Sequence, residues 1–199
     1  MVKRVNEYGR PSFNEKLKLK RYLGNIQRAA RFFEEHFINK SVVYCTSEDR
    51  IEVRFSSTNF MHLCGITYKK GSHSFFVDSL NQHLIIDDMM IKKDGTSFQK
   101  LQVLASITEI LGSYVHLTGS GRYLYLEFDY ALRTKKQILA LTLKDISQKI
   151  IPQSLLDLKN QKSFPVGVKV VCIYSKDIKS GVLTPYFIES GSKLEDYLL

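Results

Sequence analysis

The chain has 199 residues, 44% of them hydrophobic and 25% charged, a composition that excludes a largely disordered protein. No apolar run reaches the roughly 20 residues of a membrane helix, the polar first ten residues do not resemble a signal peptide, and the three cysteines form no CxxC pair. We therefore expect one domain over residues 1–199 in the reducing cytoplasm, with no membrane contact and with a net charge of +9 that suits a polyanionic partner.

The first predicted element is a basic helix over residues 14–37, with Asn14 as its N-cap. Three- and four-residue steps place on one face Leu19, Tyr22, Leu23, Ile26, Ala30, Phe33 and Phe37. The opposite face carries Lys20, Arg21, Arg28 and Arg31. Residues 1–40 hold ten Lys or Arg against four Glu, which is +6 of the net charge. This face either contacts the phosphates of RNA or is the solvated side of a helix packed on a core.

Two strands are predicted next, over 41–46 and 50–56, because Ile51, Val53 and Phe55 alternate with polar residues. Helices are predicted over 72–80 and 96–111, the second opened by a capping box at Thr96 and closed by Gly112.

The second half of the chain is predicted to form strands over 114–117, 122–133, 137–144, 167–175 and 183–188, with a hairpin turn at 118–121. A short helix is predicted over 150–158, entered at Pro152. The fold class is therefore α+β: N-terminal helices, with residues 1–40 as a basic helical segment, followed by a mostly antiparallel sheet.

Alternation along 122–133 separates two faces of the predicted sheet. The even positions from Leu124 to Leu132 should point to the core, and the other face carries Tyr125, Asp129 and Arg133. Thr142 and Lys144 of the next strand join that second face. Tyrosines can stack bases, cations can neutralise a phosphodiester, and hydroxyls or carboxylates can move protons. The face either borders an RNA-cleaving cleft or is an exposed sheet face with ordinary cross-strand pairs.

The motifs of several enzyme classes are missing from the sequence. None of the five histidines forms HExxH, no GxxxxGK[ST] or GxSxG occurs, and Asp87-Asp88 lacks a third carboxylate at useful spacing. We therefore expect neither a metal nor a cofactor. His62 remains, and it is either a hydrogen-bonded structural residue or a general base that takes the proton of a ribose 2′-hydroxyl.

A family resemblance rests on short motifs. Ile51-Glu-Val-Arg-Phe55, followed by Asn59-Phe-Met-His-Leu-Cys-Gly-Ile66, resembles the strand and F-x-HLxGI/L motif of a phage-associated nuclease family of the Barnase–EndoU–colicin–RelE-like superfamily. Residues 124–132 with 139–143, and Ser163-Phe-Pro165, are similar to further segments of that family, so the resemblance covers about residues 41–190.

The resemblance implies a nuclease-like α+β domain over 41–199 and a metal-independent endoribonuclease with a toxin-like or phage-conflict role. His62 matches the histidine of the motif and is the expected base. Asp129, Arg133, Thr142 and Ser163 lie in or beside the matching segments and are the further expected catalytic residues, while the full catalytic set of the family stays open.

The sequence thus predicts an endoribonuclease that cleaves RNA through the ribose 2′-hydroxyl. The residues expected to bind RNA are Lys20, Arg21, Arg28, Arg31, Tyr125 and Lys144. Two other functions stay open: a non-catalytic RNA-binding or protein-interaction module on the same scaffold, and a regulatory protein with an acidic partner. A toxin-like nuclease would be neutralised by an acidic antitoxin or immunity-type protein.

Overall fold

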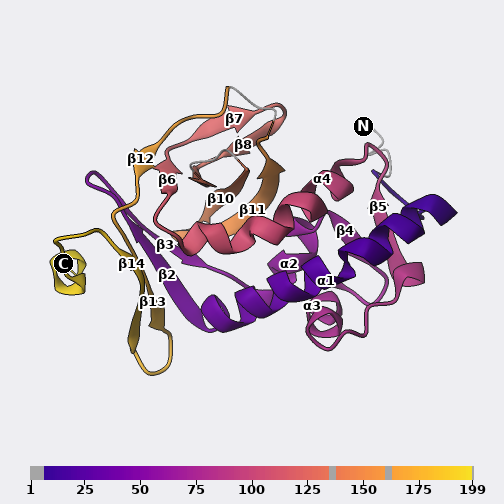
Figure 1. The fold of residues 1–199 in the computed structure, drawn as a ribbon, viewed down its shortest axis with the longest axis horizontal. Helices are drawn as coiled ribbons and strands as arrows, with labels where there is room; N and C mark the ends of the chain where they lie inside the picture. The colour runs from indigo at the N-terminus through magenta and orange to yellow at the C-terminus, as the bar shows by residue number, and fades with distance from the viewer. Residues whose placement is uncertain (1–6, 135–137, 160–162, 199) are drawn as a thin grey trace.

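The computed structural model describes residues 7–134, 138–159 and 163–198 (Figure 1). The helices are α1 Phe13–His36, α2 Ser57–Leu63, α3 Ser72–Leu80 and α4 Thr96–Val103, with 3₁₀ turns η1 Ile86–Asp88, η2 Leu104–Leu111 and η3 Leu194–Tyr197. The strands are β1 Tyr8–Gly9, β2 Lys40–Cys45, β3 Arg50–Arg54, β4 Ile66–Tyr68, β5 Met89–Lys92, β6 Val115–Thr118, β7 Gly121–Tyr123, β8 Leu126–Phe128, β9 Tyr130–Thr134, β10 Leu139–Ile146, β11 Lys149–Asp157, β12 Val168–Lys169, β13 Cys172–Asp177 and β14 Leu183–Ile188.

Nine of these strands form one curled sheet in the order β12-β6-β9-β10-β11-β3-β2-β13-β14. One pair is parallel, because Ile150 of β11 pairs with Val53 of β3. The α+β class is confirmed, but the sheet is mixed rather than mostly antiparallel, and β2 and β3 precede three of the helices. A parallel pair requires a long crossover connection. The connection between β3 and β11 contains α2, α3 and α4, and for this reason three helices follow the first two strands of the sheet.

The basic helix α1 has the predicted apolar face. Leu19, Ile26 and Phe33 are fully buried in one core with residues of the sheet, including Val53 and Leu141. Its N-cap is Ser12 rather than Asn14, because Ser12 forms a capping box with Glu15. The Glu15 carboxylate accepts a hydrogen bond from the Ser12 backbone N–H at 2.8 Å, which lowers its pKa.

The predicted helix 96–111 is α4 followed directly by the 3₁₀ turn η2. The capping box predicted at Thr96 does not form. Instead, the Asp94 carboxylate accepts hydrogen bonds from the N–H of Thr96 at 3.0 Å and from its hydroxyl at 2.7 Å. No helix of the described residues is long and apolar enough to cross a membrane.

The predicted strand 122–133 is divided into β7, β8 and β9. The chain reverses at Leu124, whose φ is +52°, so β7 and β8 form their own hairpin. The hairpin predicted at 118–121 is therefore wrong, and β6 pairs with β9. In the β7–β8 hairpin, Gly121 lies opposite Phe128, and a Cβ at Gly121 would approach the Phe128 ring to 2.8 Å. The missing side chain thus lets β8 fold back on β7.

The helix predicted over 150–158 is wrong, since this segment is strand β11 and pairs with β10 along its length. Leu155 faces the main core, while Leu156 packs on a second core formed by Phe128, Ala131, Ala140, Leu158 and Phe164. With both faces covered, the apolar run shows no two-residue alternation. Pro152 is tolerated beside the register shift between Thr142 and Leu143. The predicted strand 137–144 is β10, and Gln137 lies outside the described residues.

Candidate active site

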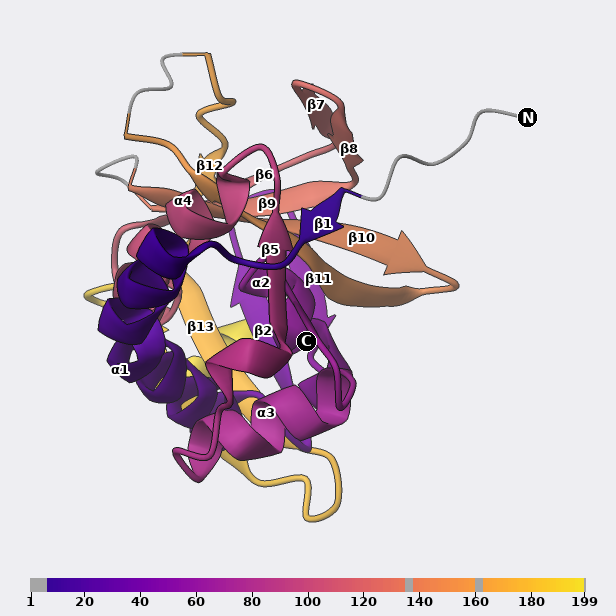
Figure 2. The same ribbon diagram turned by 90° about the vertical axis from the view of Figure 1, so that its right-hand side faces the viewer.

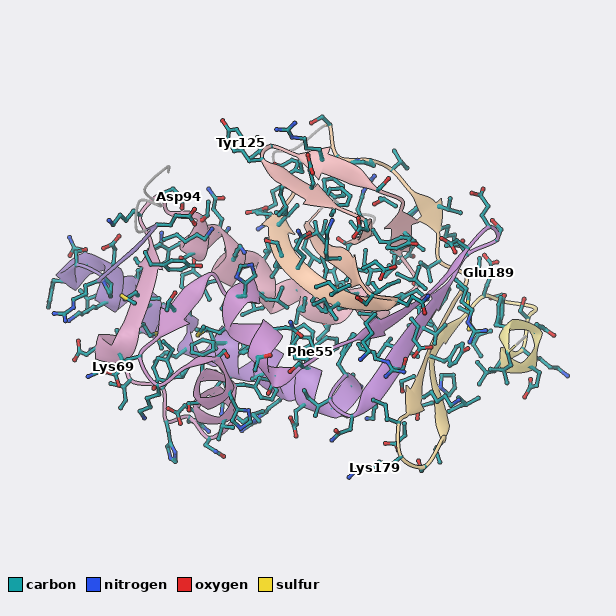
Figure 3. The ribbon with its side chains drawn as sticks, turned by 180° about the vertical axis from the view of Figure 1, so that it is seen from behind. Phe55, Lys69, Asp94, Tyr125, Lys179 and Glu189 are labelled. Atoms are coloured by element: carbon teal, nitrogen blue, oxygen red, sulfur yellow. The ribbon has the colours of Figure 1, made fainter. Side chains whose placement is uncertain are left out.

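A cleft of about 640 Å³ lies between the helical half of the chain and the β7–β8 hairpin. Figure 2 shows the hairpin on one side and β1, β5 and α4 on the other. The first wall contains Glu7, Lys92, Asp94, Thr96, Gln99 and Lys100, the second Tyr123 to Leu126, and β11 contributes Ser154 to Asp157. Figure 3 labels Asp94 and Tyr125 at the same end of the molecule, and both line the cleft.

Lys100 is the most unusual group of this cleft. It is only 7% exposed, and its Nζ donates to the Ser154 hydroxyl at 2.9 Å and to the backbone oxygen of His62 at 3.4 Å. None of the ion pairs among the described residues includes it. Burial, and then the charge of Lys92, lower the pKa of Lys100 to about 8. A lysine with this pKa can hold a phosphate or donate a proton near neutral pH.

The His62–Ile66 motif is built around this lysine. Gly65 has a φ of +66°, and a Cβ there would lie 2.9 Å from Lys100 Cδ and 3.2 Å from Ser97 Cα. The Ser97 hydroxyl donates to the Gly65 carbonyl oxygen at 2.5 Å. The glycine of the motif is therefore required both for its backbone conformation and for the approach of Lys100.

His62 lies in the last turn of helix α2 and is exposed. Enough protein surrounds the ring for desolvation to lower its pKa, and the charges of Lys100 and Lys92 lower it further. Among the described residues, no hydrogen bond involves the imidazole nitrogens of His62. The imidazole is therefore neutral at neutral pH and available as a proton acceptor beside two cations of the cleft.

Two other predicted catalytic residues are buried, where an open sheet face was expected. Thr142 is fully buried and Arg133 is 6% exposed, because the second core covers their face of the sheet. The Thr142 hydroxyl donates to the Ser154 carbonyl oxygen at 3.2 Å, which links Thr142 to the cleft through β11. Arg133 donates to the Pro165 carbonyl oxygen at 2.9 Å, away from the residues that line the cleft.

Asp129, Lys144 and Ser163 do not line the cleft. Asp129 accepts a hydrogen bond from the Asp145 N–H at 2.8 Å and one from Lys144 at 3.1 Å, and both lower its pKa. Ser163 is exposed in the segment before β12. Tyr125 therefore lines the cleft. His62 does not line it, but its backbone oxygen accepts from Lys100, and Thr142 is bonded to Ser154. Among the described residues, Asp129, Arg133 and Ser163 neither line the cleft nor form a side-chain hydrogen bond to a residue that does.

The four cations predicted on the first helix are all exposed on α1. They are Lys20, Arg21, Arg28 and Arg31. Arg28 donates to the Asn25 side chain at 2.5 Å, and none of the four is among the described residues that line the cleft. This arrangement fits a phosphate-binding face and a solvated face equally, so the RNA-binding role stays a prediction.

The sequence interpretation missed Lys100 and Ser154. Lys100 lies three residues after Ser97 and four before Leu104, on the buried face of α4 and η2. A lysine on the apolar face of a helix was the signal that could have identified it. Ser154 gave no such signal, because its segment was interpreted as a helix.

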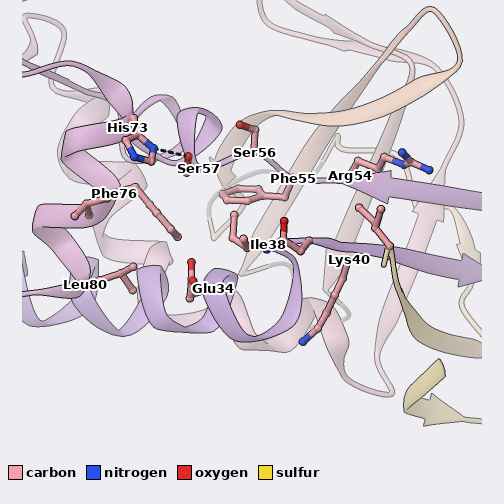
Figure 4. A pocket seen from close by; sticks show the side chains of 13 residues that line it. Glu34, Ile38, Lys40, Arg54, Phe55, Ser56, Ser57, His73, Phe76 and Leu80 are labelled. Carbon is pink, nitrogen blue, oxygen red and sulfur yellow. Dashed lines mark hydrogen bonds between the residues drawn. The ribbon is translucent and has the colours of Figure 1, made fainter. Parts of the chain in front are cut away.

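A second hollow of about 490 Å³ lies between α1, α3 and β3 (Figure 4). In it, Ser57 Oγ and His73 Nδ1 lie 3.0 Å apart. Figure 4 shows Arg54 and Lys40 directed away from the Phe55 ring. Arg54 is paired with Glu52 at 3.1 Å, and Lys40 donates to the Glu35 carbonyl oxygen. The cations of this hollow are already partnered, so the Lys100 cleft is the better candidate.

The comparisons with known proteins agree with a nucleic-acid-cleaving site. The model of a family described as "phage-Barnase-EndoU-ColicinE5/D-RelE like nuclease4" matches residues 25–185. The match includes His62, Lys100, Tyr125 and Ser154, and it begins within α1, earlier than the quoted motifs. No curated protein and no solved structure matches the chain. Within the described residues, no three His, Cys, Asp or Glu side chains are grouped as a metal site requires.

Proposed function

Because the chain belongs to the phage-Barnase-EndoU-ColicinE5/D-RelE like nuclease4 family, we propose that it cleaves RNA, without a metal ion, in the cleft around Lys100. The observation that carries this proposal is the buried ammonium of Lys100, which has no carboxylate partner among the described residues and lies in an open cleft. Burying a charged group without a partner of opposite charge costs free energy of folding. A phosphodiester in the cleft would supply the missing negative charge.

In the proposed reaction, the neutral imidazole of His62 takes the proton of the ribose 2′-hydroxyl. The 2′-oxygen attacks phosphorus, and the bond from phosphorus to the 5′-oxygen breaks. Lys100 stabilises the negative charge of the phosphorane and gives a proton to the departing 5′-oxygen. The products are a 2′,3′-cyclic phosphate and a free 5′-hydroxyl. Ser154 is a positioning residue, because its hydroxyl accepts the hydrogen bond that orients the Lys100 ammonium.

The wider surface fits a polyanionic substrate. The net charge is +9, and the exposed α1 cations are proposed to bind phosphates on either side of the cleaved bond. We further propose that the nuclease acts in the cytoplasm in a toxin-like role, with an acidic antitoxin or immunity-type protein as its neutralising partner. The basic charge supports such a partner through electrostatic complementarity.

The decisive experiment is cleavage of an RNA and of the DNA of the same sequence, both with EDTA present. We expect cyclic phosphate ends on the RNA, no cut in the DNA, and loss of cleavage in Lys100→Met and His62→Gln. Equal cutting of DNA, or cleavage that EDTA abolishes, would overturn the proposed chemistry. RNA binding without any cleavage would favour the non-catalytic alternative.

A further inference from the structure

The tip of the β7–β8 hairpin exposes two large apolar side chains over the cleft. Leu124 and Tyr125 form the two-residue turn between the paired residues Tyr123 and Leu126. Leu124 is 72% exposed and Tyr125 95% exposed. Leu124 also has a φ of +52°, a conformation that is unfavourable for leucine. Exposed apolar groups on a strained turn beside a cleft are typical of a ligand contact.

The base of the hairpin is held in place while its tip is not. The Tyr123 ring meets Phe164 edge-on at 5.7 Å, and Phe164 stacks on Phe128 at 5.7 Å. Tyr125 takes part in none of the ring contacts among the described residues. The structure therefore presents one aromatic ring on a supported hairpin with its faces open, as a stacking platform requires.

The hairpin end of the cleft carries one carboxylate, because Asp157 lines it together with Tyr123 and Tyr125. The opposite wall carries both signs of charge: Lys92 and Lys100, and also Glu7 and Asp94. Lys92 pairs with Glu7 at 3.8 Å, so Lys100 is the cation of that wall that has no ion pair among the described residues. Burial raises the pKa of Tyr123, and the Asp157 carboxylate raises it further, so the carboxylate is close to that hydroxyl. Asp157 Oδ1 accepts a hydrogen bond from the Lys159 N–H at 3.0 Å, and no hydrogen bond among the described residues uses Oδ2. A carboxylate repels phosphate but accepts hydrogen bonds from the amino group of a base.

We propose that this end of the cleft binds the base of the ribonucleotide whose 2′-hydroxyl attacks, stacked on Tyr125 and with its amino group donating to Asp157. This inference rests on the proposed function and adds its substrate class. The base must be unpaired, because a paired base exposes neither its face nor its amino edge. Adenine, cytosine and guanine carry such an amino group. Uracil has no amino group, and its single donor on that edge, N3–H, lies between two carbonyl oxygens that Asp157 would repel.

The test uses four DNA oligonucleotides that each contain one ribonucleotide, with A, C, G or U at the same place. Only the bond after the ribonucleotide can then be cut through a 2′-hydroxyl. We expect cleavage at A, C and G to exceed cleavage at U by about tenfold or more. Annealing the complementary strand should stop cleavage at all four. Asp157→Asn should reduce the discrimination against U by about tenfold.

Variants at the tip separate stacking from folding. Tyr125→Ala should lower kcat/KM by about 10–100-fold on every substrate, while Tyr125→Phe keeps it. Both variants should melt like the wild type, because the side chain contacts so little of the protein. Tyr114→Ala is the matched control, since Tyr114 is 61% exposed and does not line this cleft.

The possible failures are distinguishable. If the wild type cuts none of the four ribonucleotides but cuts DNA, the proposed function itself fails. If it cuts all four at equal rates and Tyr125→Ala cuts as well as the wild type, the base site is wrong and the ribonuclease stands. Unchanged cleavage after annealing would likewise overturn the requirement for an unpaired base.

Discussion

The ammonium of Lys100 donates a hydrogen bond to the hydroxyl of Ser154 at 2.9 Å. Lys100 belongs to helix α4 and Ser154 to strand β11, so this bond joins the helical half of the chain to the sheet. The carbonyl oxygen of His62 accepts from the same ammonium at 3.4 Å. One buried cation thus connects the family motif around His62 with strand β11, whose Ser154 lies 54 residues after Lys100.

Lys100→Met should abolish cleavage and leave the protein as stable as the wild type or more stable. The fold lowers the pKa of this lysine from 10.5 to about 8, which corresponds to a cost of about 3 kcal/mol for the ammonium form. A methionine of similar volume removes that cost but leaves Ser154 without its donor. We therefore expect the free energy of unfolding at pH 7 to rise by about 0–3 kcal/mol.

Chemical denaturation at several pH values tests whether the higher stability of Lys100→Met comes from removing the buried ammonium. The unfolded chain keeps the lysine proton up to pH 10.5, while the folded protein releases it near pH 8. The unfolded state then binds more protons, so wild-type stability should rise with pH in this window and approach that of Lys100→Met. Lys149→Met, at an exposed position, is the control. A variant that is less stable at every pH would contradict the cost assigned to the charge.

The pH dependence of cleavage should be bell-shaped. The base must be unprotonated, so kcat/KM should rise through the pKa of His62, which lies below the ordinary value of 6.5. The acid must be protonated, so the rate should fall above the Lys100 pKa of about 8. Lys100→Arg should remove the alkaline limb, because arginine stays protonated. An alkaline limb that persists in this variant would assign the acid to another residue.

His62→Gln should lose about 10²–10⁴-fold in cleavage rate with little change in melting temperature, since the ring is exposed. His62→Ala serves as the second variant, and both are measured with EDTA present. A structural histidine would behave in the opposite way, with a lower melting temperature and full activity per folded molecule. In that case the base would have to be sought among the residues that line the cleft.

Gly65→Ala should reduce both stability and activity. The left-handed backbone costs about 1–2 kcal/mol for alanine, and the new Cβ would overlap Lys100 Cδ at 2.9 Å. Gly181→Ala is the matched control, because Gly181 also has a positive φ but has open space around it. We expect the control to lose stability and keep its activity, as measured by melting and by cleavage. Equal activity in both variants would show that the approach of Lys100 to Gly65 does not matter for cleavage.

Charge reversal at Arg21 and Arg28 should weaken RNA binding. Each lost phosphate contact should flatten the slope of log affinity against log salt concentration by about one. Lys179→Glu, on the exposed loop between β13 and β14, provides the comparison. If the two α1 variants keep the wild-type slope, this face of α1 is only solvated.

Local patterns in the sequence were enough to predict several features. The three- and four-residue spacing of apolar residues predicted the buried face of α1. The alternation of Ile51, Val53 and Phe55 with polar residues predicted β3. Both patterns are visible in the sequence because each element buries a single face. The short motif around His62 was enough to indicate the nuclease family. These features depend on residues that are close together in the chain.

Only the tertiary structure decided the rest. β11 is covered on both faces, so its apolar run resembles a helix in sequence, and its strand character comes from pairing with β10 and β3. The second core buries Thr142 and Arg133 because distant residues such as Phe164 pack on the sheet. The pKa of Lys100 depends in the same way on burial between α4 and β11. Desolvation is set by atoms that surround a group in space, and no local spacing of residues specifies them.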